Sequence, residues 1–80
     1  MKNDNDKALL GMASLQIKYK NFDKANSFIK KVLKISPNNA EAYNSLGMLY
    51  LENNQYEKAL QNFNKSIELN PWWPSESANT

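Results

Sequence analysis

The chain repeats itself with a period of 34 residues. The segment FDKA at residues 22–25 returns as YEKA at residues 56–59. Other pairs at the same distance are Lys31 with Lys65, Pro37 with Pro71, Ala8 with Ala42 and Leu15 with Leu49. A fixed period of this length is typical of stacked helical repeats, in which each repeat buries its apolar surface against the next. Such arrays usually serve as binding surfaces, so the period favours a binding function over a catalytic one.

Apolar residues spaced by three and four predict four helices, over about 6–19, 22–35, 39–53 and 55–69. The first helix should turn Leu9, Met12, Ala13 and Gln16 inward. Pro37 should end the second helix, because proline disfavours helical geometry in the residue before it. Asn38 fits an N-cap for the third helix, with Glu41 three residues later as its capping-box partner.

The helices group into two helical hairpins, residues 6–39 (unit 1) and residues 40–73 (unit 2), with a flank at 1–5 and a polar tail at 74–80. Small residues at equivalent places, Ala13 and Gly47 on the first helices and Ala25 and Ala59 on the second, should let the paired backbones approach closely. Glycine inside a helix costs about 1 kcal/mol relative to alanine. Gly47 therefore predicts a place where no side chain fits.

The pattern resembles the tetratricopeptide repeat family. In unit 2 the residues at that family's signature spacing are Tyr43, Leu46, Gly47, Tyr50, Tyr56, Ala59, Phe63 and Pro71. In unit 1 they are Ala13, Phe22, Ala25 and Pro37. The resemblance implies an all-α fold in which two tandem units form a short right-handed α-solenoid. It also implies that the chain binds a protein or peptide partner in a concave groove.

The resemblance places the first helix of each unit along that groove. The residues expected to face it are Lys7, Leu10, Ser14, Ile17 and Lys18 from unit 1, and Glu41, Asn44, Met48, Leu51 and Glu52 from unit 2. The apolar members form a stripe that could receive an apolar or amphipathic segment. Two alternatives are that the stripe packs against a neighbouring copy or that it adds to a thin core.

The residue content argues against several other classes of function. The sequence has no cysteine and no histidine, which removes thiolate metal sites, the commonest metal ligand and the commonest general base. We therefore predict that the chain is no enzyme and needs no metal or cofactor. The basic residues are all lysine and the net charge is only +2, which argues against nucleic acid as a partner. No apolar run approaches the ~20 residues that span a bilayer. We expect an intracellular, cytoplasmic protein.

Two repeats are fewer than the three or more that such arrays normally need, so one flank of unit 2 should be uncovered. Candidate residues for self-association are Leu60, Phe63, Ile67, Trp72 and Trp73. Residues 1–39 carry eight lysines against three aspartates, a net +5, and residues 40–80 carry two lysines against five glutamates, a net −3. The basic half could stack head-to-tail on the acidic half of another copy, although a two-fold dimer would close and is favoured. The sequence thus predicts a peptide-binding adaptor that self-associates. A minimal or engineered repeat protein whose main property is assembly is the alternative.

Overall fold

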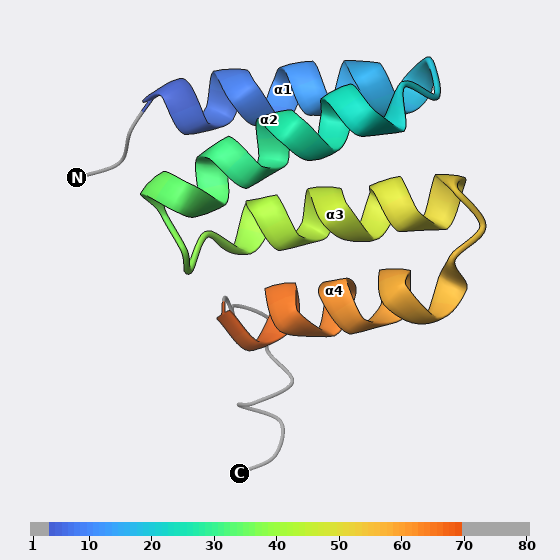
Figure 1. The fold of residues 1–80 in the computed structure, drawn as a ribbon. Helices are drawn as coiled ribbons and strands as arrows, with labels where there is room; N and C mark the ends of the chain where they lie inside the picture. The colour runs from blue at the N-terminus through green and yellow to red at the C-terminus, as the bar shows by residue number, and fades with distance from the viewer. Residues whose placement is uncertain (1–3, 70–80) are drawn as a thin grey trace, which may run out of the picture.

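A computed structural model describes residues 4–69 of the chain, and this part consists of four helices joined by short turns (Figure 1). They are α1 (Asp4–Lys18), α2 (Phe22–Ile35), α3 (Ala40–Glu52) and α4 (Tyr56–Leu69). The predicted all-α fold with two helical hairpins is confirmed, and α2 has the predicted bounds. Helix α1 begins two residues before the expected Asp6, within the segment assigned to the N-terminal flank.

The two hairpins turn in the same way. Lys20 and Asn54 are equivalent in the repeat, and both have left-handed backbone, with φ of 65° and 64°. The next backbone N–H in each turn reaches back five residues, from Asn21 to the Gln16 carbonyl at 2.8 Å and from Gln55 to the Tyr50 carbonyl at 2.8 Å. This is the Schellman arrangement, which satisfies carbonyl groups that a helix end leaves unpaired. The two turns therefore have the same backbone geometry, although the residues in them differ.

The prediction that Asn38 caps the third helix is wrong by one residue. The side-chain Oδ1 of Asn39 accepts the backbone N–H groups of Glu41 at 2.9 Å and Ala42 at 3.2 Å. The Asn39 backbone N–H meanwhile donates to the carbonyl of Ser36 at 3.1 Å, which closes the turn before the helix starts. Asn39 is thus the last residue outside the helix and the only one of the two asparagines that can act as its cap.

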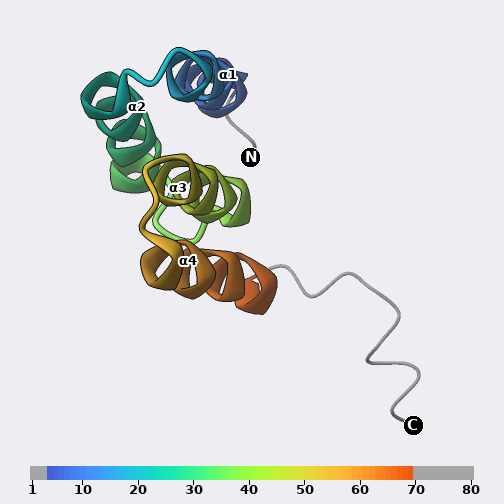
Figure 2. The same ribbon diagram turned by 90° about the vertical axis from the view of Figure 1, so that its right-hand side faces the viewer.

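Helix α1 packs on α2, and α3 packs on α4, while α3 also contacts both helices of unit 1. Figure 2 shows α3 beneath the α1–α2 pair, with α4 below it. The main core is therefore shared between the two units. It is formed by Leu10, Ala13, Ile17, Ala25, Ile29, Val32, Ala42 and Leu49.

The buried face of α1 differs from the predicted one. Ala13 is fully buried and Leu9 and Gln16 are half-buried, but Met12 is exposed. Leu10 and Ile17 take part in the core instead. Helix α1 contacts α3 as well as α2, so a second side of it is covered. The face that α1 buries is therefore turned toward unit 2.

Gly47 lies where the sequence predicts a close approach. A Cβ atom added to it would lie 2.6 Å from ring carbons of Phe63, well inside van der Waals contact. The ring of Phe63 thus occupies the space that a side chain at Gly47 would need. Gly11, in α1, has no such neighbour within 4 Å, so it does not have the same function.

One buried polar group was not anticipated from the sequence. Asp6, in the first turns of α1, is buried, and its Oδ2 accepts the Ser36 hydroxyl at 2.9 Å and the Asn39 amide at 3.4 Å. These bonds tie the start of α1 to the turn between the two units. The equivalent residue in unit 2 is Ala40, whose backbone carbonyl accepts the Ser66 hydroxyl at 2.8 Å.

Candidate functional site

The first helices of the two units present a mostly polar surface, which we call the α1–α3 face. Eight of the ten residues expected in the groove are exposed on it: Lys7, Ser14, Lys18, Glu41, Asn44, Met48, Leu51 and Glu52. Met48 and Leu51 are the large apolar members, with 41% and 44% of their surfaces exposed. They are three residues apart on α3 and so lie side by side on its surface.

Leu10 and Ile17, the two other expected members, do not lie on this face. Only 6% of Leu10 and 3% of Ile17 is exposed, and both belong to the core shared between the units. The alternative that part of the apolar stripe adds to a thin core is therefore correct for these two residues. Their equivalents in unit 2, Asn44 and Leu51, are exposed because the described residues provide no third unit to cover them.

Opposite charges border the apolar centre of the α1–α3 face. Lys7 and Lys18 come from α1, whereas Glu41 and Glu52 come from the two ends of α3. An exposed ion pair joins the units at one edge, with the Lys20 ammonium 3.8 Å from a carboxylate oxygen of Glu52. The face can thus offer an apolar contact between exposed lysines on α1 and exposed glutamates on α3, which suits a peptide that carries both charges.

A second candidate surface lies on α4. Leu60 and Ile67 are exposed, and Phe63 between them is half-buried because its ring packs over Gly47. We call these three residues the open face of unit 2. The sequence also assigned Trp72 and Trp73 to this surface, but they lie outside the described residues.

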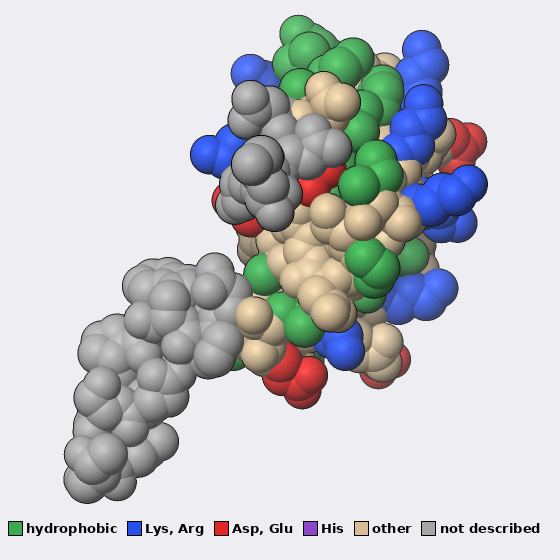
Figure 3. Space-filling view, turned by 90° about the vertical axis from the view of Figure 1, so that its left-hand side faces the viewer, with side chains coloured by type: hydrophobic (Ala, Val, Ile, Leu, Met, Phe, Trp, Pro, Cys, Tyr) green, Lys and Arg blue, Asp and Glu red, His purple; other side chains and the backbone are tan. Residues whose placement is uncertain are grey.

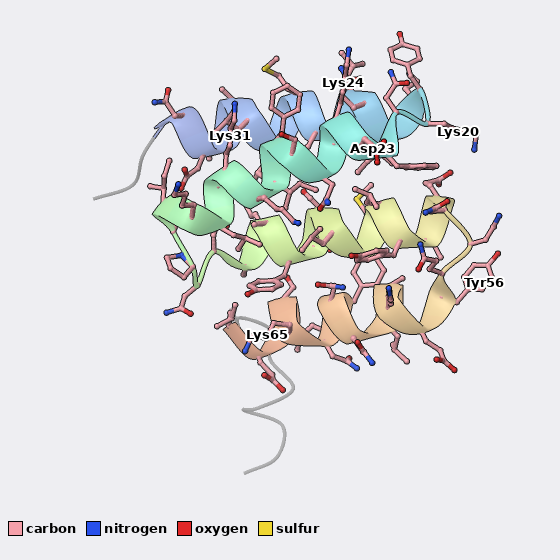
Figure 4. The ribbon with its side chains drawn as sticks, in the orientation of Figure 1. Lys20, Asp23, Lys24, Lys31, Tyr56 and Lys65 are labelled. Atoms are coloured by element: carbon pink, nitrogen blue, oxygen red, sulfur yellow. The ribbon has the colours of Figure 1, made fainter. Side chains whose placement is uncertain are left out.

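The outer side of α2 carries exposed lysines and a shallow hollow. The hollow is lined by Asp23, Asn26, Ser27, Lys30, Lys31 and Lys34. Lys24 and Lys31 can be followed on α2 in Figure 4, and Figure 3 shows lysines (blue) along one edge of the molecule.

Within residues 4–69, no three acidic, histidine or cysteine side chains come close enough to hold a metal ion. Nor is any helix of this part long and apolar enough to cross a membrane.

Comparison with known proteins identifies the two units. Two sequence profiles of the tetratricopeptide repeat match residues 6–39 and 40–72. The chain is also similar to Superkiller protein 3 of Schizosaccharomyces pombe, with 37% identity over 57 residues. That match covers 71% of this chain but only 4% of the relative. No solved structure gave a significant match. The two profiles together span most of the chain, which therefore belongs to the tetratricopeptide repeat family, whose repeats form protein–protein interaction modules.

Proposed function

We propose that the chain binds a peptide or helix of a partner protein through the α1–α3 face. The exposure of Met48 and Leu51 supports this most directly. Helix α3 contacts all three other helices, yet two of its large apolar side chains remain in solvent, next to each other. Covering a side chain of this kind contributes on the order of 1.5–3 kcal/mol when burial is complete. A partner segment with two or three apolar anchors would obtain most of its binding energy there.

The charges around these two residues suggest the chemistry of the partner. A segment that lies across α1 and α3 would meet Lys7 and Lys18 on one side and Glu41 and Glu52 on the other. An amphipathic segment with an acidic edge and a basic edge is complementary to that arrangement. Binding of this kind needs no cofactor, nucleic acid or catalysis, and a cytoplasmic location stays a prediction.

Peptide selection followed by affinity measurement tests this proposal. Peptides selected on the intact chain from a random library should bind the chain, and fluorescence anisotropy gives their Kd. Replacing Met48 and Leu51 together by serine should raise Kd by at least about tenfold, since both anchors lose their contact. Ile35→Ser is the matched control, because Ile35 is an exposed apolar residue on α2. Equal affinities for the wild type and the double variant would reject the α1–α3 face.

Self-association through the open face of unit 2 is a second proposed function. Leu60 and Ile67 are exposed at a place where the described residues provide no further helix. Replacing Leu60 by serine should reduce the sedimentation coefficient of an assembly. Met48→Ser should leave it unchanged, because Ser14, the equivalent of Met48 in unit 1, stays exposed although unit 2 is packed on unit 1. Assembly without any selectable peptide would favour the alternative, a repeat protein whose main property is assembly.

A further inference from the structure

An apolar stripe runs along the outer side of α1, away from every other helix. Ala8, Met12 and Leu15 recur at spacings of four and three residues, so they share one side of α1, and Tyr19, four residues further on, is the first residue after the helix. All four are exposed, and Met12 and Leu15 each leave 48% of their surface in solvent. Figure 3 shows the hydrophobic side chains gathered at the upper end of the molecule, over α1. We call these four residues the α1 stripe.

The internal repeat shows what such a stripe does when it is covered. The equivalents of Ala8, Met12 and Leu15 in unit 2 are Ala42, Leu46 and Leu49 on α3. Ala42 and Leu49 are buried in the core that α3 shares with unit 1, and Leu46 packs against that core. Two of the three residue pairs are identical. The α1 stripe thus has the composition of a surface that this chain already uses to attach one unit to another.

The opposite end of the molecule carries the complementary surface. In unit 1, α2 contributes Ile29 and Leu33 to the core that receives α3. Their equivalents in unit 2 are Phe63 and Ile67, which belong to the open face of unit 2 together with Leu60. Within residues 4–69, an unused half of the inter-unit interface therefore lies at each end. The two halves differ, so a contact that uses both would join unlike ends of two copies.

We propose that the α1 stripe of one copy docks on the open face of unit 2 of a second copy, in the arrangement by which α3 docks on unit 1. This proposal rests on the self-association proposed above and names the surface of the partner. Because one end meets the other, the contact is head-to-tail, and the docked pair retains one free α1 stripe and one free open face.

The charge distribution supports the same polarity. Residues 1–39 carry a net +5 and residues 40–80 a net −3, so the first half of one copy and the second half of another attract each other. A two-fold dimer through two α4 helices would instead bring the two acidic halves together and leave both α1 stripes in solvent. The exposed stripe on α1, which the sequence did not predict, thus favours the open stack over the two-fold dimer.

Sedimentation velocity with two complementary variants tests the proposal. Leu15→Glu places a charge in the α1 stripe, and Leu60→Glu places one in the open face of unit 2. The wild type should sediment faster as its concentration rises, with species larger than a dimer. Each variant alone should remain a monomer at concentrations at which the wild type associates, since a buried unpaired carboxylate opposes docking. Mixed in equal amounts, the two should form a heterodimer, because each retains the half that the other lost.

The other outcomes each contradict the proposal in a distinct way. If Leu15→Glu associates as the wild type does and Leu60→Glu does not, the contact is a two-fold one through α4, and self-association stands without the head-to-tail arrangement. If the wild type remains a monomer, self-association fails as well, and other units or partners cover both ends. If the mixed variants do not pair, the two surfaces are not complementary. Ile35→Glu, which lies outside both surfaces, controls for the added charge. Met12→Glu and Ile67→Glu form a second pair of variants for the same two surfaces, and circular dichroism checks that they remain folded.

Discussion

Equivalent helices of the two units differ in how much they bury. Ala25, Ile29 and Val32 of α2 are fully buried, whereas Ala59 is the one buried residue of α4. The equivalents of Ile29 and Val32, Phe63 and Ser66, are half-buried. The two helices have the same place within their own hairpins, but among the described residues only α2 has a further helix, α3, packed against its other side. Burial in this molecule is thus a property of the contact between units more than of the unit itself.

The units also solve the same packing problem with different residues. In unit 1 an alanine, Ala13, and a β-branched residue, Ile29, occupy the positions where unit 2 has Gly47 and Phe63. The smaller residue on the first helix accompanies the larger one on the second. Phe63 can lie flat against α3 only because Gly47 lacks a Cβ atom. Each pair therefore fits as a pair, and exchanging one member alone should destabilise the chain.

The largest expected effect is the removal of a side chain from the covered helix. Ile29→Ala should lower the free energy of unfolding by ~2–5 kcal/mol, because Ile29 is fully buried and a cavity would remain. Ile67→Ala, at the open end, should cost about 1 kcal/mol or less, because much of that side chain is in solvent. Urea titration followed by circular dichroism measures both.

Ile35→Ala serves as the control for this pair, since the isoleucine is exposed on α2 and should be nearly neutral when replaced. Both titrations belong at low concentration, at which copies do not associate. Equal losses from Ile29→Ala and Ile67→Ala would mean that the open face of unit 2 is covered in the isolated chain. The contrast between the two units would then be wrong.

A smaller effect should come from the paired residues at the centre of unit 2. Gly47→Ala should destabilise the chain by ~1–2 kcal/mol, because overpacking against the Phe63 ring outweighs the better helix propensity of alanine. Adding Phe63→Ile recreates the pair found in unit 1 and should recover about 1 kcal/mol of this loss. The double-mutant cycle, measured by urea titration, gives the coupling between the two positions.

Gly11→Ala is the matched control for that cycle. Gly11 is exposed in α1 and a Cβ atom there would meet nothing within 4 Å, so alanine should stabilise the chain by up to about 1 kcal/mol. The two glycine substitutions are thus expected to have opposite signs. Additive effects of Gly47→Ala and Phe63→Ile would show that the ring moves aside without cost, and that the units do not depend on matched pairs.

Much of this fold can be predicted from the sequence, because the same pattern of residues occurs in both units. The 34-residue period can be recognised directly in the sequence. The effects of Pro37 and Gly47 each follow from the chemistry of that one residue, so no knowledge of distant contacts is needed to predict them. The prediction that no side chain fits at Gly47 is confirmed, and the structure shows that the Phe63 ring fills this space. The exposure of Leu60 and Ile67 follows from counting units and is also confirmed.

The candidate site was less predictable, because it depends on how one unit sits on the other. Leu10 and Ile17 share the groove side of α1 with Ser14 in the sequence pattern, but α3 approaches from that side and buries them. Met12 becomes exposed for the same reason. Asp6 is buried only because the turn between the units brings Ser36 and Asn39 to it. Contacts between residues some 30 positions apart leave no periodic trace in the sequence.

The smallest expected effect concerns the turns that the two hairpins share. Lys20 and Asn54 both have a left-handed backbone, a conformation that costs most residues with a Cβ atom roughly 1–2 kcal/mol and asparagine less. Lys20→Asn should therefore stabilise the chain by ~0.5–1 kcal/mol, and Asn54→Lys should destabilise it by a similar amount. The midpoints of urea unfolding report both changes. The exposed ion pair of Lys20 with Glu52 opposes the first effect only weakly, and Glu52→Gln, which breaks that pair alone, should leave the midpoint nearly unchanged. Equal losses of stability in Lys20→Asn and Glu52→Gln would contradict this expectation. They would show that the ion pair of Lys20 with Glu52 contributes more to stability than the left-handed backbone of Lys20 costs.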